Sequence, residues 1–164
     1  MSTIEGLSGH IWPIHPKPLT DELLTSWMVR IARAYGVRAD WFWDFVWPHP
    51  ELQVWAYLDR RAPKDLLTLL ALRTATHDAR VQQTTLTAFE CIHAVPRFTT
   101  TLNFCRECLR EDAEPYFRRC WQLPSFSFCT HHRALLSSRH PFTRTLPSLP
   151  PRHSSRWTVG VETP

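Results

Sequence analysis

The sequence predicts a mainly α-helical fold with a small Cys- and His-rich module near its C-terminal end. Apolar residues recur at helical spacing in the first part of the chain, and two Cys/His pairs follow after residue 100. The 164 residues, 43% hydrophobic and 21% charged, are typical of a globular chain of about one domain. We expect a helical domain over 1–95, the Cys/His module over 96–140 and a Pro-, Ser- and Arg-rich tail over 141–164.

The first helix is expected after a proline-rich start, because prolines between residues 13 and 18 oppose a helix there. Thr20 or Asp21 is the expected N-cap. The apolar stripe of this helix consists of Leu23, Leu24, Trp27, Met28, Ile31, Ala32 and Tyr35. We expect Trp27 to lie in the core, and Arg30 and Arg33 to lie on the opposite, polar side.

The step from Ala32 to Gly36 is typical of a helix-turn-helix, because Gly takes the left-handed conformation of such a turn. A second helix is expected over 39–46, with Val37, Phe42 and Phe45 on its inner side. The step recurs from Ala71 to Ala75, with Val81 at the position of Phe42. Since Ala disfavours positive φ, the second unit is expected to be weaker or distorted.

Two interpretations of the first helix pair stay open. In one, the second helix reads DNA and Arg38 is a candidate contact, although Asp40 and Asp44 would then face the phosphates. In the other, the pair is an ordinary helical hairpin that uses the same residues as core.

Three further helices are expected, over about 51–60, from residue 63 to a break near 74–77, and over about 78–85. Residues 86–95 are expected to be irregular or partly helical. The alternation of Ser125–Cys129 indicates a short strand.

Two Cys/His pairs predict a zinc-ribbon module. Cys105-x2-Cys108 is followed, after a 20-residue spacer, by Cys129-x2-His132. Each pair places two ligands on one tight turn, and three thiolates with one imidazole suit one structural Zn²⁺ that keeps no open position for catalysis. His131 is the rival ligand, but Cys-x2-His is the usual reach. The other interpretation, unrelated buried thiols, is disfavoured by the paired spacing.

The sequence argues against a membrane protein, a secreted protein and a Gly-rich phosphate-binding loop. No apolar run approaches the ~18 residues that a membrane span needs. The first residues do not resemble a signal peptide, and five cysteines are an odd count for a disulfide framework, so we expect a reducing, cytoplasmic location. Cys91 and Cys120 are expected to be core thiols. No Gly-rich phosphate loop occurs.

The basic charge lies in the C-terminal third. Residues 1–100 carry ten basic and ten acidic side chains, whereas residues 101–164 carry nine Arg against five acids. This asymmetry suits an anionic partner or a solubilising tail. The candidate nucleic-acid or partner contacts are Arg110, Arg118, Arg119, Arg133, Arg139 and Arg144. Either Arg118 or Arg119 is alternatively expected to stack on a neighbouring aromatic ring.

An enzyme is the disfavoured class. Glu107, Glu111, Asp112 and Glu114 lie beside the first Cys pair and could be read as a metal-dependent nuclease centre. No second cluster of acids or histidines supports such chemistry, so a polar turn is the better interpretation.

Two stretches together resemble the TniQ family, the TniQ/TnsD proteins of heteromeric DDE transposons and CRISPR-associated transposons. PKPLTDELLTSWMVRIARAYGV (16–37) is similar to the opening P-x-P-x3-E-x-L-x-S-W of the family. FCRECLREDAEPYFRRCWQLPSFSFCTHHRALL (104–136) is similar to its zinc segment. The chain departs from the family in having Thr130 where a Pro is common, and Arg139-His140-Pro141 where a further Cys-Pro-x-Cys often follows. Longer members continue into a large C-terminal region, and the sequence, which stops before it, is expected to be either a short form or a fragment.

The resemblance implies a non-catalytic adaptor in transposition. Such a protein links target recognition, by DNA sequence or by an RNA-guided CRISPR effector, to the AAA+ ATPase of the transposon, which recruits the transposase. It implies a bacterial cytoplasmic protein that acts at the nucleoid, and a homodimer is left open. The alternative is a sequence-specific helix-turn-helix and zinc DNA-binding regulator.

Overall fold

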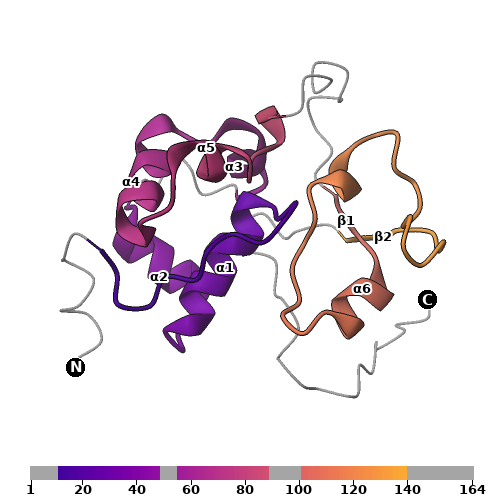
Figure 1. Cartoon of the computed structure of the whole chain (residues 1–164), viewed down its shortest axis with the longest axis horizontal. Coiled ribbons are helices and arrows are strands. Elements are labelled where there is room, and N and C mark those ends of the chain that lie inside the picture. The colour runs from indigo at the N-terminus through magenta and orange to yellow at the C-terminus, as the bar shows by residue number, and fades with distance from the viewer. Residues whose placement is uncertain (1–10, 49–54, 89–100, 140–164) are drawn as a thin grey trace.

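The computed structural model describes residues 11–48, 55–88 and 101–139, and this part of the chain is mainly helical, as predicted (Figure 1). The N-terminal elements are α1 (Leu24–Ala34), α2 (Ala39–Val46), α3 (Trp55–Arg61), α4 (Lys64–Thr74), α5 (Asp78–Gln82) and the short 3-10 helix η3 (Leu86–Ala88). The C-terminal elements are β1 (Leu102–Phe104), α6 (Arg106–Glu111), the 3-10 helix η5 (Cys120–Gln122) and β2 (Ser137–Arg139). Within the described ranges, no helix has the length and apolar character to cross a bilayer.

Helix α1 forms the centre of the fold. Figure 1 shows it between the other N-terminal helices and the C-terminal elements. Nine of its eleven residues are buried, and Trp27 is 0% exposed, which confirms its predicted place in the core. The Trp27 indole N–H donates to the Pro16 carbonyl at 2.7 Å, so the proline-rich segment is tied to the helix that it precedes.

Aromatic rings pack α2 against α1. Phe42 and Trp43 are both 0% exposed, and Trp12 lies edge-on to each of them with centroid separations of 5.6 and 6.1 Å. The Trp43 indole N–H donates to the Met28 carbonyl at 3.1 Å, which satisfies its polar atom inside the core.

The two predicted helix–turn–helix steps share their turn geometry. Gly36 has φ of 71°, and Ala75 takes the same left-handed conformation with φ of 48°. Phe42 and Val81, predicted to be equivalent, are both completely buried. The unfavourable conformation of Ala75 is held from outside the turn, because the Lys17 ammonium donates to its carbonyl at 2.6 Å.

The inner face predicted for α2 is wrong at one position. Phe45 is 51% exposed, although it was expected to face inward with Phe42. Because each residue of a helix advances by about 100°, the buried pair Phe42 and Trp43 turns the inner face away from Phe45.

The predicted N-cap of α1 is also wrong. The helix begins at Leu24 and its N-cap residue is Leu23, which provides no side-chain hydrogen bond, while Asp21 lies two residues before it with φ of 58°. Distant segments instead accept the free N–H groups at this end. Leu23 donates to the carbonyl of Phe117 at 2.9 Å, Leu24 to that of Thr84 at 2.9 Å, and Thr25 to the Asp59 carboxyl at 2.8 Å.

The C-terminal strands differ from the predicted one. Strands β1 and β2 pair in antiparallel fashion, with Leu102 opposite Arg139 and Phe104 opposite Ser137. Residues 125–129 form no strand apart from a single bridge between Phe128 and Leu135. A turn closed by the hydrogen bond from the Phe126 N–H to the Leu123 carbonyl (3.0 Å) takes the place of extended backbone.

We expect Trp27→Ala to lower the free energy of unfolding by about 3–5 kcal/mol, because it leaves a large cavity in the core. Chemical denaturation followed by circular dichroism measures the change. Leu72→Ala, which truncates a side chain that is 65% exposed, is the control and should stay within about 0.5 kcal/mol. A loss of similar size in both variants would contradict the central place of Trp27.

The buried carboxyl of Asp59 predicts a pH dependence. Burial raises its pKa to about 7, against the lowering effect of hydrogen bonds from the N–H and hydroxyl of Thr25. The unfolded chain releases this proton near the ordinary pKa of about 4, whereas the folded chain keeps it up to about pH 7. This carboxyl's contribution to stability is greatest below that window and falls as the pH rises through it.

We expect Asp59→Asn to remove this contribution, because an amide can still accept from the Thr25 N–H but carries no charge. The measurement is the unfolding free energy from about pH 5 to about pH 8, taken as the difference from the unmodified chain so that other groups cancel. Asp65→Asn, at an exposed position of α4, is the control. A pH slope left unchanged by Asp59→Asn would show that Asp59 is already ionised in the fold.

Candidate metal centre

The first Cys pair is presented by the junction of β1 and α6. Cys105 follows the strand directly and is the N-cap residue of α6, and Cys108 lies in the first turn of the helix. The Leu109 N–H donates to the Cys105 carbonyl at 3.2 Å, which closes that turn. Because Cys105 and Cys108 are three positions apart in this helical turn, both sulfur atoms lie on the same side.

The second pair lies on a tight turn. The Arg133 N–H donates to the Cys129 carbonyl at 2.7 Å, and the Cys129 N–H donates to the Ala134 carbonyl at 2.7 Å. Arg133 closes the turn in the left-handed region, with φ of 52°. This turn directs the His132 ring back toward the sulfur of Cys129, at 3.8 Å from Nδ1.

The β1–β2 pairing joins the two turns, because β1 leads into the first and β2 follows the second. The Gln122 amide holds β1 from the other side. Its oxygen accepts from the Asn103 N–H at 3.1 Å and its nitrogen donates to the Asn103 carbonyl at 2.7 Å. These contacts fix the positions of the two ligand pairs relative to each other.

The structure brings Cys105, Cys108, Cys129 and His132 together in the arrangement of a metal centre. His132 Nδ1 lies 3.6 Å from the Cys105 sulfur and 3.3 Å from the Cys108 sulfur, and the sulfurs of Cys108 and Cys129 are 3.6 Å apart. A tetrahedral ion with S₃N ligands requires separations of roughly 3.6–3.8 Å. The three cysteines are buried, at 1%, 4% and 3% exposed. The four residues could therefore hold one metal ion.

The thiols differ in their acidity. Burial raises the pKa of Cys105 and of Cys108. Burial also opposes ionisation of Cys129, but hydrogen bonds from the backbone and the ring of His132 outweigh it and lower the pKa to about 7. A bound cation would favour all three thiolates, so metal binding would release protons.

Glu111 orients the histidine ligand. Its carboxylate lies 2.9 Å from His132 Nε2, while Nδ1 of the same ring faces the sulfurs. Such carboxylate–histidine–metal relays fix the ring orientation and raise its basicity. From the sequence alone, Glu111 is expected only as part of a polar turn. The signal that could have found it is its spacing, three residues after Cys108 on the same helix.

The other acidic residues considered for a nuclease centre are held in ion pairs. Asp112 accepts two hydrogen bonds from Arg118, at 2.9 and 3.0 Å, and Glu107 pairs with Arg110. A further group of Glu111, His131 and His132 is close enough to bind a metal, but it shares His132 with the first centre and is more exposed.

A buried arginine joins the helices to the metal-binding module. Arg30 is 3% exposed and donates to Glu22 at 2.6 Å and to Glu114 at 2.8 Å. The prediction that Arg30 lies on a polar outer side is therefore wrong, because the module covers that side of α1. Burial raises the pKa of the Glu22 carboxyl to about 7, although the adjacent guanidinium favours its ionised form.

Backbone hydrogen bonds reinforce this junction. Phe117 accepts from the Leu23 N–H at 2.9 Å and donates its own N–H to the Ser26 hydroxyl at 2.9 Å. The Arg119 N–H donates to the Asp21 carbonyl at 2.8 Å. The segment before the second Cys pair is thus attached to the start of α1.

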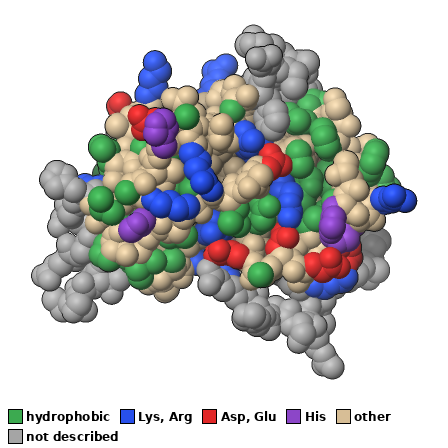
Figure 2. Space-filling view, viewed as in Figure 1, with side chains coloured by type: hydrophobic (Ala, Val, Ile, Leu, Met, Phe, Trp, Pro, Cys, Tyr) green, Lys and Arg blue, Asp and Glu red, His purple; other side chains and the backbone are tan. Residues whose placement is uncertain are grey.

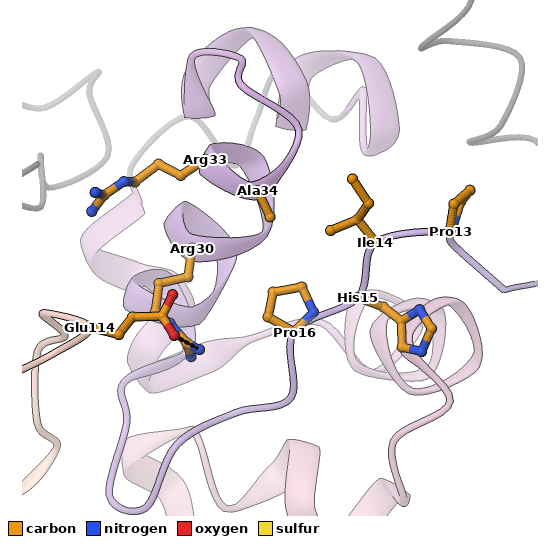
Figure 3. Close-up of a pocket in the computed structure, with 8 residues that line it drawn as sticks. All are labelled: Pro13, Ile14, His15, Pro16, Arg30, Arg33, Ala34 and Glu114. Carbon is orange, nitrogen blue, oxygen red and sulfur yellow. Dashed lines mark hydrogen bonds and ion pairs between the residues drawn. The ribbon is translucent and has the colours of Figure 1, made fainter. Parts of the chain in front are cut away.

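A groove of about 770 Å³ opens beside this junction, between the proline-rich segment, α1 and the loop of Glu114 (Figure 3). Figure 3 shows Arg30 and Glu114 joined on one side and Ile14 and Pro16 across from them. The metal ligands do not line it. The groove is lined by Pro13, Ile14, His15, Pro16, Arg30, Arg33, Ala34 and Glu114.

Arg118 and Arg119, two of the candidate partner contacts, bind within the chain. The Arg118 guanidinium lies over the rings of Tyr116 (4.4 Å) and Trp121 (4.9 Å), which agrees with the prediction that one of the two arginines stacks. Arg119 forms an ion pair with Asp21 at 3.3 Å. Both side chains are largely covered, at 20% and 15% exposed.

The other candidate arginines are placed differently. Arg110 and Arg38 are 59% and 81% exposed and each pairs with an acidic neighbour, while Arg133 is exposed at the second ligand turn. Arg139 ends β2, its side chain lying outside the described part, and Arg144 lies beyond the described residues. On the face shown in Figure 2, acidic side chains lie beside basic ones.

We expect the purified chain to contain about one metal ion, measured by elemental analysis, and chelation to unfold the C-terminal module, because metal binding and folding are coupled in such sites. Cys108→Ser should lose the ion and the near-ultraviolet signal of the module's aromatic residues. Cys120→Ser removes a thiol outside the ligand set and serves as the control. Retention of full structure in chelator would contradict a structural metal.

The match to a known family covers both parts of the structure. The TniQ family model matches residues 13–136, from the proline-rich segment through the helices to the end of the second ligand turn. A search of curated proteins finds no match. Because the matched residues make up most of the 164-residue chain, the chain belongs to the TniQ family.

Proposed function

We propose that this chain is a non-catalytic adaptor in transposition, which links recognition of a target site to the AAA+ ATPase of the transposon. The ATPase in turn recruits the transposase. The observation that carries the proposal is the family match over residues 13–136. The target is read either as DNA sequence or through an RNA-guided CRISPR effector, and the neighbouring genes distinguish the two.

We propose Zn²⁺ as the ion of the metal centre. Three thiolates and one imidazole are a usual structural zinc set, and the separations of the ligand atoms suit its tetrahedral geometry. Four protein ligands leave no position for a substrate or an activated water. The ion's part in this proposal is to hold the module in shape.

The side chains around the centre support an adaptor over an enzyme. Glu111 is occupied with the histidine ligand, and Asp112 and Glu114 with Arg118 and Arg30. Each of these contacts gives its acid a role in holding the structure together, and that role requires no chemistry. Their pairing supports the assignment of these acids to structure.

The architecture suits a protein that connects two others. The N-terminal helices and the metal-binding module each offer a separate outer surface, and the Arg30 junction holds the two surfaces in one orientation. A rigid connection of this kind lets binding on one part position what is bound on the other.

The helix-turn-helix geometry favours a second candidate, a DNA-binding regulator. Gly36 has the expected turn conformation, and α2 takes the place of a recognition helix. The outward residues of α2 include Trp41 and Asp44, and neither supplies the positive charge that contacts with phosphates require. We therefore rank this candidate below the adaptor.

We expect the chain to bind the AAA+ ATPase encoded beside it, on DNA, and we expect the combined change of Arg133, Arg139 and Arg144 to Ala to weaken that binding and flatten its salt dependence. Removing cations that contact phosphate or an acidic surface reduces the number of released counterions. Fluorescence anisotropy at rising salt measures both quantities.

Arg61→Ala, at an exposed position of α3, is the control and measures the effect of removing an arginine from the helical part. Lack of any binding by the unmodified, metal-loaded chain would contradict the adaptor function. Binding that the triple variant retains with the same salt slope would leave the adaptor function intact and exclude Arg133, Arg139 and Arg144 as its contacts.

A further inference from the structure

The outward side of α2 carries two exposed aromatic side chains. Trp41 is 48% exposed and Phe45 is 51% exposed. Four residues apart on the helix, their rings stack on each other with a centroid separation of 6.2 Å and an interplanar angle of 11°. Together they form one flat apolar surface that faces away from the core.

The core does not require these two rings. On the other side of α2, Phe42 and Trp43 are completely buried and pack on Trp12, and Tyr35 stacks on Phe42 at 5.5 Å. Exposed Trp and Phe side chains that lie together on a surface mark binding sites in folded proteins. Trp is also among the side chains that contribute most of the energy when a protein interface forms.

The charge on this side of α2 favours a protein over DNA. Asp44, which precedes Phe45 in the sequence, is exposed, and its carboxylate would repel phosphates. The guanidinium of Arg38, at the start of the helix, is paired with Asp40. An acidic group next to two aromatic rings suits a partner that offers apolar side chains together with a cation.

We propose that Trp41, Asp44 and Phe45 form a docking surface for an amphipathic segment of a protein partner, whose apolar side chains cover the two rings and whose lysine or arginine pairs with Asp44. This inference rests on the proposed function, since the adaptor's ATPase is the partner with which it is tested. It gives α2 a role in protein binding at the position where a helix-turn-helix would read DNA.

The test measures the affinity of the full-length chain for the neighbouring AAA+ ATPase by isothermal titration calorimetry. The double variant Trp41→Ala/Phe45→Ala should bind at least about tenfold more weakly, as expected when aromatic hot-spot residues are truncated. Asp44→Lys should also weaken binding, and Asp44→Asn should weaken it less. Leu72→Ala, at a side chain that is 65% exposed on α4, is the matched control and should bind as the unmodified chain does.

All variants are first checked for unchanged circular dichroism and metal content, since none of the substituted side chains lies in the core or at the metal. Equal affinity of the double variant and the unmodified chain overturns the docking surface and leaves the adaptor function intact. No binding by the unmodified chain overturns both. Two further results would overturn the proposed occupant. If the double variant loses binding to a DNA duplex, the surface binds nucleic acid. If the double variant is a monomer where the unmodified chain is a dimer, the surface binds a second copy.

Discussion

The buried guanidinium of Arg30 holds the two parts of this protein together. It lies between Glu22, at the start of α1, and Glu114, in the loop that follows α6. Removing either carboxylate would leave the buried guanidinium with one anionic partner in place of two, and such losses are costly because a buried charge depends on its partners. Further contacts cross the same junction, including the hydrogen bond from the Phe117 N–H to the Ser26 hydroxyl.

The metal centre and the helices are consequently linked. The segment that pairs with the start of α1 lies between the two ligand pairs, so it is held at both ends by the ligand turns and along its length by the helix. Several residues that carry the family resemblance serve this linkage: Glu22, Ser26 and Arg30 on α1 or before it, and Phe117 in the module. Residues of both family motifs, 16–37 and 104–136, thus help to join the helices to the metal-binding module.

Helix α2 shows how a fold leaves function open. Its left-handed turn at Gly36 and its buried ring at Phe42 are the two features that the sequence predicted for a helix-turn-helix. What such a helix binds is decided by its outward side chains, and here these are Trp41, Asp44 and Phe45. The same geometry that places a basic helix in the DNA groove can present an aromatic and acidic surface to a protein.

The sequence by itself determined what local chemistry controls. Helical periodicity predicted the helices, the need for positive φ predicted the role of Gly36, and the spacing of two Cys/His pairs predicted which side chains meet. Tertiary structure decided the rest. Arg30 is buried because a distant loop covers it. Segments far along the chain, and not Asp21, accept the N–H groups at the start of α1, and Phe45 faces outward because Phe42 and Trp43 face the core. Such outcomes depend on contacts between residues far apart in the chain, which periodicity within one helix cannot reveal.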